Sequence, residues 1–215
     1  MAVIDVGGVM IQLVDEGDAI VRAIKQGKRW EAETRAMWPS LIDPLTTVID
    51  VGAYSGVYAI SAALVGAGVI AFEPHPANYD RLLENQRLNN VVIGTVPYAM
   101  SNRKGTFLLR MPTALDVMND QASLEGDGGI TVDVRTNRLD AEWSFPSRVG
   151  LIKIDVERHE PAVIEGAIGL LDKDRPALLV EELDKAMHEA VRVVLPNGYR
   201  QVAVLDGRNV LYRSE

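Results

Sequence analysis

The sequence predicts an α/β fold with a doubly wound, seven-stranded sheet that is mostly parallel and ends in an antiparallel edge strand. Two observations support this class. Short β-branched runs alternate with longer segments of helical spacing, which is the pattern of parallel strands joined by crossover helices. An Asp-Gly pair separates the last two apolar runs, and because such a pair favours a tight hairpin, the final strand should run against the others.

Residues 1–45 are predicted to form a cap made of a hairpin and two helices. Val3–Val14 alternates and carries a Gly-Gly pair, which indicates a hairpin. Asp18 can cap a first helix, and Trp30–Leu41 has the spacing of a second. We expect one compact domain, in which this cap precedes a sheet domain that occupies residues 46–215.

The stretch Thr46–Pro76 predicts a strand, a glycine turn, a helix and a second strand. Gly52 and Gly56 follow the first strand, and glycine removes the Cβ that would keep a ligand away from the backbone N–H groups. Glu73 ends the second strand, 23 residues after Asp50. An acid at the tip of the neighbouring parallel strand can accept hydrogen bonds from both ribose hydroxyls. The sequence therefore predicts a ligand that contains a ribose.

The spacing of the glycines indicates which kind of ribose-containing ligand binds here. The turn has the pattern Asp-x-Gly-x-x-x-Gly, whereas dinucleotide folds use Gly-x-Gly-x-x-Gly and P-loops use Gly-Lys-Ser/Thr. A looser turn with its own acid suits a cofactor that has no phosphate and that carries an ammonium group. We therefore predict S-adenosylmethionine, and a nicotinamide dehydrogenase is disfavoured.

The rest of the chain continues the alternation of helices and strands. Helices are expected at Ala77–Leu88, Glu160–Leu171 and Asp184–Leu195. Strands are expected at Val69–Phe72, Val91–Val96, Thr106–Met111, Ile130–Thr136, Gly150–Asp155, Pro176–Val180, Tyr199–Leu205 and Asn209–Tyr212. The irregular insert Pro112–Gly129 has the character of a lid or binding loop, and a plain surface excursion is the alternative.

Four blocks of the sequence, in order, resemble the FkbM-type S-adenosylmethionine-dependent methyltransferases, a branch of the class I methyltransferases. The blocks are VIDVGAYSGVYA from Val48, AFEPHPANYDRLLENQRLN from Ala71, LIKIDVERHEPAVIEGA from Leu151 and RPALLVEE from Arg175. The resemblance extends from about Trp30 to the C-terminus and implies a Rossmann-like class I methyltransferase fold. Two residues depart from it, because Tyr54 stands where Asn is usual and Arg158 stands where Gly is usual.

The resemblance and the strand-tip argument together assign cofactor contacts to the residues Asp50, Gly52, Ala53, Tyr54, Gly56, Glu73, Pro74, Tyr98, Ala99, Ser101 and Asp155. The segment Tyr98–Asn102 is included because it would lie beside the adenine if the ribose binds Glu73. A plain turn explains the same composition. In the resemblance the cap lies over the cofactor pocket, and Glu31 is a candidate contact there.

Methyl transfer to a hydroxyl needs a base to remove the proton. His159 is the histidine nearest to the predicted rim of the sheet, so it is the candidate catalytic base. Glu157 can orient the acceptor, or act as the base together with Asp155. The alternative for His159 is a residue at a helix start that only bonds Glu160 or solvent.

A metal site is a further hypothesis at the same rim. Asp155 and the pair Glu181 and Glu182 end consecutive strands, and three carboxylates can hold Mg²⁺ or Ca²⁺. The alternative is that the glutamate pair starts a solvated helix.

Composition restricts the partners and the location. The chain of 215 residues is 47% hydrophobic, carries a net charge of −8 and contains no cysteine. No basic stripe is present, so nucleic acid is disfavoured as a partner. No signal peptide and no apolar run of about 20 residues is present, so we expect a cytoplasmic protein with no membrane partner. The sequence leaves a homo-oligomer open.

The predicted activity is S-adenosylmethionine-dependent O-methylation of a small-molecule hydroxyl acceptor. The acceptor would be a sugar, a polyketide or another small metabolite, as in natural product biosynthesis. Two alternatives remain. One is an N-methyltransferase, and the other is a non-catalytic S-adenosylmethionine-binding protein, which Tyr54 and Arg158 would favour.

Overall fold

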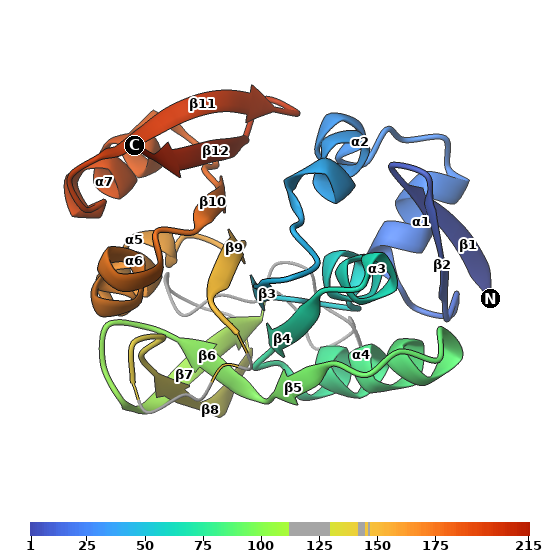
Figure 1. Ribbon diagram of the computed structural model, residues 1–215. Coiled ribbons are helices and arrows are strands. Elements are labelled where there is room, and N and C mark those ends of the chain that lie inside the picture. Colours follow the sequence, from blue (N-terminus) through green and yellow to red (C-terminus); the bar gives the residue numbers. More distant parts are fainter. Residues whose placement is uncertain (112–129, 142–144, 146) are drawn as a thin grey trace.

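A seven-stranded sheet forms the centre of the molecule (Figure 1). The structure is a computed structural model and describes residues 1–111, 130–141, 145 and 147–215. The strand order is β11-β12-β10-β9-β3-β4-β5. The parallel strands are β10 (Ala177–Glu181), β9 (Val149–Ile154), β3 (Thr47–Val51), β4 (Gly68–Phe72) and β5 (Gly94–Val96). The order reverses between β3 and β9, which makes this the switch point of the sheet.

The last two strands are arranged differently from the prediction. β12 (Asn209–Ser214) is antiparallel to both β10 and β11 (Tyr199–Leu205), so it lies one strand inside the edge. The edge strand is β11, and the predicted antiparallel edge is wrong in this detail. The apolar residues Val210, Leu211 and Tyr212 of β12 are all buried, whereas most of β11 is exposed. The more apolar strand therefore occupies the inner position and the more polar strand occupies the edge.

Helices cover both faces of the sheet, as the doubly wound class requires. Successive side chains of a strand point to opposite faces. In β3, Val48 therefore packs into one core, while Ile49 and Val51 pack into another. The first core includes α3 (Val57–Val65) and part of α4 (Pro76–Leu88). The second is built on α5 (Glu160–Glu165), α6 (Ile168–Asp174) and α7 (Lys185–Val194).

The predicted N-terminal cap packs into the first core. It consists of β1 (Ala2–Val6), β2 (Val9–Leu13), α1 (Ala19–Lys25) and α2 (Ala32–Leu41). Asp18 caps α1, since its side chain accepts a hydrogen bond from the Val21 N–H at 2.9 Å. Trp38 is fully buried and meets Tyr58 of α3 edge-on, with 4.9 Å between ring centroids. This contact fixes the cap against the sheet domain.

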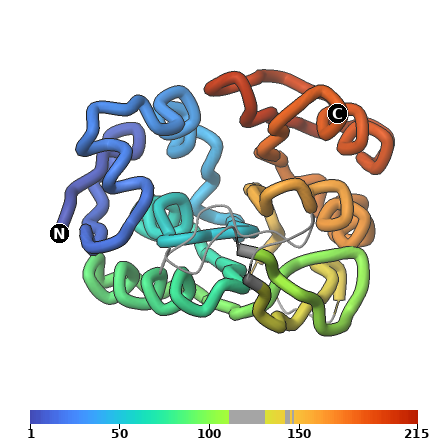
Figure 2. Tube along the Cα trace, turned by 180° about the vertical axis from the view of Figure 1, so that it is seen from behind, coloured from blue at the N-terminus to red at the C-terminus, as the bar shows by residue number. Residues whose placement is uncertain are grey.

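The cap also meets the C-terminal hairpin. The start of α2 and the turn between β11 and β12 lie side by side at the top of both views (Figures 1 and 2). The Asp206 N–H donates to the Glu33 carboxylate at 2.7 Å, and Asp206 accepts from the Glu33 N–H at 3.0 Å. Two segments that are 173 residues apart in sequence thus close one end of the molecule.

A second sheet has three strands. Its order is β6-β8-β7, formed by β6 (Tyr98–Met100), β8 (Ile130–Asn137) and β7 (Gly105–Met111). The segment expected as a possible turn after Val96 is thus a short strand. The insert Pro112–Gly129, predicted to cover the substrate, lies outside the described residues.

The helix predicted over Glu160–Leu171 is divided into α5 and α6. Gly166 stands at the break, and a Cβ there would lie 2.0 Å from the Ser101 carbonyl oxygen. The glycine therefore lets the end of β6 approach the helix pair. None of the described helices has the length and apolar character needed to span a bilayer.

Candidate active site

A cavity opens at the carboxyl ends of the parallel strands, beside the switch point. Four of its lining residues follow or end four different strands: Gly52 after β3, Glu73 after β4, Asp155 after β9 and Glu181 on β10. Open α/β sheets bind their ligands at this place. The predicted meeting of strand-end acids at one rim is therefore confirmed for three of them.

The glycine turn and Glu73 form one corner of the cavity. Gly52 has a φ of +81°, and a Cβ there would lie 1.8 Å from the Asp155 carbonyl oxygen, so this position requires glycine. The carboxylate of Glu73 accepts hydrogen bonds from the backbone N–H of Tyr54 at 2.8 Å and of His75 at 2.9 Å. Burial raises the pKa of Glu73 to about 7. The acid thus fixes the turn and faces the cavity.

The structure brings most of the predicted cofactor residues together. The lining includes Gly52, Tyr54, Glu73, Pro74, Tyr98, Ala99 and Asp155. Phe72, Met100 and Leu109 add an apolar wall that the sequence did not indicate. The hydroxyl of Tyr54 accepts a hydrogen bond from the Ala19 N–H at 3.0 Å, which ties the turn to the cap.

Four predicted cofactor residues do not line the cavity as the described residues delimit it: Asp50, Ala53, Gly56 and Ser101. Asp50 lies in the interior of the sheet, where burial raises its pKa to about 6 despite the nearby positive charge of Lys153. Ala53 packs in the first core, and Gly56 starts α3 against Leu82. Asp50, Ala53 and Gly56 were predicted to contact the cofactor because they lie close to Gly52 in the chain. In the structure, however, only some residues of this turn face the cavity.

Ser101, predicted to contact the cofactor, lies next to His159. Its hydroxyl lies 3.0 Å from Nε2 of His159. His159 is buried at the start of α5 and lines the cavity. The structure thus places His159 where a base could act, and it places Ser101 beside the histidine.

Arg158 pairs with Asp184, a residue that is not named in the cavity lining as described. Its guanidinium donates to the Asp184 carboxylate at 2.8 Å, and it is absent from the cavity lining as described. The guanidinium thus takes part in an exposed ion pair with Asp184. The φ of Arg158 is +81°, a backbone region that favours glycine, which gives a physical reason for the usual residue at this position.

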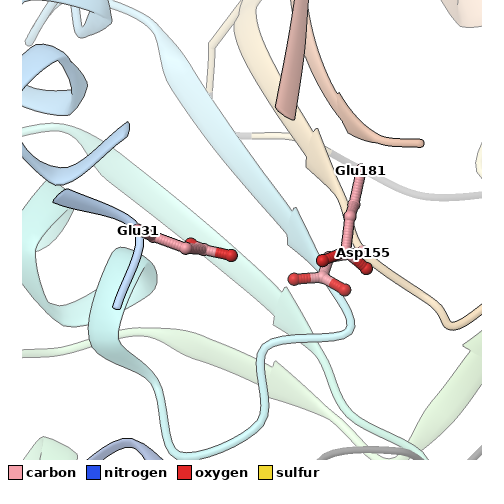
Figure 3. A group of neighbouring side chains, drawn as sticks. All are labelled: Glu31, Asp155 and Glu181. Atoms are coloured by element: carbon pink, nitrogen blue, oxygen red, sulfur yellow. The ribbon is translucent and has the colours of Figure 1, made fainter. Parts of the chain in front are cut away.

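Three carboxylates gather at the other end of the cavity (Figure 3). Glu31 from the start of α2 points toward Asp155 and Glu181. One oxygen from each residue lies within 4.8 Å of the others. Burial and the charge of Asp155 raise the pKa of Glu181 to about 9. Burial opposes ionisation of Asp155 too, but Lys153 at 2.7 Å keeps the pKa of Asp155 below its ordinary value.

Glu182 is not part of this group, so its predicted role as a metal ligand is wrong. It accepts a hydrogen bond from the Tyr212 hydroxyl at 2.7 Å and contacts Nδ1 of His188 at 2.5 Å. Consecutive residues of an extended segment face opposite sides, so Glu181 and Glu182 cannot both face the cavity. Glu31 of the cap takes its place.

Residues 50–201 match the model of the family described as Methyltransferase FkbM domain. The chain belongs to the FkbM family of S-adenosylmethionine-dependent methyltransferases. The match covers the glycine turn, Glu73, the loop of Asp155 to His159 and the strand of Glu181.

Relatives of this FkbM methyltransferase include a curated archaeal protein and solved structures. The hexuronic acid methyltransferase AglP of Haloferax volcanii is 28% identical over 122 residues, which are 57% of this chain and 50% of AglP. The crystal structure of methyltransferase FkbM from Methylobacillus flagellatus KT superposes with a TM-score of 0.56 at 14% identity, over 94% of this chain and 61% of that one. A putative rRNA methylase from Clostridium thermocellum gives 0.52 at 8% identity, over 88% and 93%. The structural likeness supports the class I fold, and the chain spans about half the length of AglP.

Two cations of the FkbM site were missed by the sequence analysis. Lys153 stands in an apolar strand, and its Nζ lies 4.9 Å from the ring centroid of Tyr58. Arg208 comes from the hairpin turn and contacts Glu31 at 3.4 Å and Glu181 at 3.2 Å. Lys153 could have been predicted from the sequence, because a lysine within the apolar segment Gly-Leu-Ile-Lys-Ile is expected to be buried, and a buried lysine is expected to pair with an acid. Arg208 had no comparable signal.

Proposed function

We propose that this FkbM methyltransferase moves the methyl group of S-adenosylmethionine to a hydroxyl of a sugar or of a similar small metabolite. The observation that carries the proposal is that Glu73 and His159 line the same cavity. Glu73 is an acid that can accept hydrogen bonds from ribose hydroxyls, and His159 is a base that can take the proton of an alcohol.

The residues of the cavity fit the cofactor by their chemistry. Glu73 offers carboxylate oxygens to the ribose hydroxyls, and Phe72, Met100 and Leu109 offer an apolar wall to the adenine. When bound, S-adenosylmethionine supplies a methyl group activated by its sulfonium.

His159 would accept the proton of the acceptor hydroxyl. The imidazole would hold that proton, so that the acceptor oxygen could receive the methyl group that S-adenosylmethionine would supply. Holding the acceptor in line accounts for several kcal/mol. A positioned base adds a factor of about 10² to 10⁴ in rate. Glu157, which also lines the cavity, would orient the acceptor.

A sugar is the acceptor class with the most support. AglP is named for hexuronic acid, and it is similar to this chain over 122 residues. The acceptor end of the cavity carries Glu31, Asp155, Glu157 and Arg208, which can receive and donate hydrogen bonds to several hydroxyls. A polyketide offers fewer such groups. We therefore place a small polyhydroxylated acceptor here.

The test is an assay of S-adenosylhomocysteine formation by the purified chain with hexoses, hexuronic acids and amine acceptors. We expect turnover with a sugar and a methyl ether in the product, identified by mass spectrometry. Resistance of the product to mild alkali distinguishes an ether from a methyl ester. Turnover with amines alone would contradict the proposal and favour N-methylation. Binding of NAD with no binding of either sulfur ligand would exclude the cofactor.

A further inference from the structure

The first turn of α2 is capped by a residue from the other end of the chain (Figure 1). Glu31 occupies the N-cap position of this helix, and its side chain makes no capping hydrogen bond. The carboxylate of Asp206 instead accepts from the backbone N–H of Glu33 at 3.0 Å and of Thr34 at 2.8 Å. The Glu33 carboxylate accepts in return from the Asp206 N–H at 2.7 Å. This is the reciprocal pattern of a capping box, formed between two distant segments.

The cap from Asp206 allows the Glu31 side chain to face the cavity instead of its own helix. Glu31 lines the cavity, its side chain is only 2% exposed, and it accepts a hydrogen bond from the Tyr58 hydroxyl at 2.5 Å. Its backbone has a φ of +40°, in the left-handed region that residues with a side chain occupy at an energetic cost. Such strain persists where surrounding contacts hold it in place, and the contacts of Asp206 with the first turn of α2 are of this kind.

The hairpin turn brings Arg208 to the same place. Asp206 has a φ of +51° and Gly207 a φ of +73°, so the turn between β11 and β12 is left-handed at both positions. Arg208 follows directly and lines the cavity, and its Nη2 lies 3.4 Å from Oε1 of Glu31. Its Nε contacts Glu181 at 3.2 Å, whereas Nη1 makes no contact with the described residues. The turn therefore presents donors beside the carboxylate of Glu31.

We propose that Asp206 and Glu33 are positioning residues of the acceptor site. They hold Glu31 and Arg208 side by side, so that this pair binds neighbouring hydroxyls of the acceptor. A hydroxyl both donates and accepts, and a carboxylate next to a guanidinium serves both functions. Asp206 and Glu33 act through the pair, because neither belongs to the cavity lining as described. This role rests on the proposed function, whereas the capping contact does not.

The first measurement concerns the cap itself. Hydrogen exchange followed by NMR reports the protection of the Glu33 and Thr34 amides. Both amides should be protected in the parent chain and should exchange about tenfold faster in Asp206→Ala, because the variant loses the carboxylate that accepts from them. Equal exchange in the two chains would overturn the inference.

The second measurement is steady-state methyl transfer with the acceptor varied at saturating S-adenosylmethionine. Asp206→Ala should raise the KM of the acceptor about tenfold and leave kcat within about twofold, because the lost interaction holds the acceptor before and during the reaction. The dissociation constant of the cofactor should not change. Glu33→Ala should act in the same direction, and it should cause no further rise in an Asp206→Ala background, since the two residues act as one unit.

The conservative variant Glu33→Gln should keep the KM of the parent chain. Its amide oxygen can still accept from the Asp206 N–H, so the contact survives without the charge. A KM as high as that of Glu33→Ala would contradict the positioning role.

Asp184→Ala is the matched control. Asp184 caps α7 by accepting from the Met187 N–H at 2.9 Å, and it does not belong to the cavity lining as described. The control loses a helix cap of the same kind, so its melting temperature should fall as that of Asp206→Ala does. Its KM for the acceptor should equal that of the parent chain. A similar rise of KM in the control, or no rise in Asp206→Ala and Glu33→Ala, would overturn the inference.

The outcome is separable from that of the proposed function. If the parent chain methylates a hydroxyl acceptor and Asp206→Ala has the same KM, the positioning role is refuted and the proposed function stands. If the parent chain binds S-adenosylmethionine and methylates no hydroxyl acceptor, the proposed function is refuted and the positioning role falls with it. The amide exchange decides in either case whether Asp206 caps α2.

Discussion

The hydroxyl of Ser101 lies 3.0 Å from Nε2 of His159. The two residues belong to different parts of the fold, since Ser101 follows β6 and His159 precedes α5. Gly166 permits this meeting, because a side chain there would collide with the Ser101 backbone. The contact fixes the imidazole at the wall of the cavity and leads to the first two predictions.

His159→Ala should lower kcat about 10²-fold to 10⁴-fold, because it removes the proposed base. The dissociation constant of S-adenosylmethionine should remain unchanged, since Glu73 and the glycine turn are intact. Turnover assays and calorimetry measure the two quantities. Equal turnover in the variant would remove His159 from the mechanism and favour Glu157 as the base.

Ser101→Ala should lower kcat less than His159→Ala does, because the base remains but loses a positioning contact. The double variant distinguishes positioning from a general loss of structure. Groups that act as one unit are non-additive, so Ser101→Ala should cause no further loss of turnover in a His159→Ala background. A full additional loss would show that Ser101 acts elsewhere.

Glu73→Ala should weaken S-adenosylmethionine binding well over tenfold. Each charged hydrogen bond to a ribose hydroxyl is worth about 1.5 to 3 kcal/mol. Calorimetry at pH 8 measures the effect where the acid is ionised. Glu182→Ala, outside the cavity lining, should bind the cofactor normally. An unchanged constant for Glu73→Ala would contradict the ribose assignment.

Glu73 should also make stability depend on pH. Its pKa is raised by burial from 4.5 to about 7, so between these values the folded protein binds more protons than the unfolded chain. The free energy of unfolding should therefore fall as pH rises through this window, by a contribution on the order of 3 kcal/mol. Urea unfolding of the parent chain and of Glu73→Gln measures this, and the difference between their curves isolates Glu73 from Asp50 and Glu160. Parallel curves would refute the shift.

Arg158→Gly should stabilise the fold relative to Arg158→Ala by about 1 kcal/mol, because the residue has a φ of +81°. Both variants lose the exposed bridge to Asp184, so that contribution cancels in the comparison. Turnover should be unchanged in both, since Arg158 pairs with Asp184 and is not part of the cavity lining as described. Thermal unfolding and the methyl transfer assay check the two statements, and an unaltered or lower melting temperature for the glycine variant would contradict the strain.

The sequence by itself determined the strand, glycine turn, helix and acid of Thr46–Pro76, and with it the fold and the place of Glu73. These features are local, because the residues that specify them lie close together in the chain. Asp18 and the hairpin of residues 2–13 were predictable for the same reason.

Only the tertiary structure decided which acids share the cavity. Glu181 faces it and Glu182 does not, because the strand alternates its side chains, and a pattern of two adjacent acids cannot say which one points inward. Asp50 is buried in the sheet and is not part of the cavity lining as described, while Glu31 reaches the cavity from a cap that docks through Trp38 and Tyr58. Such docking depends on packing between segments far apart in sequence, which no local pattern encodes.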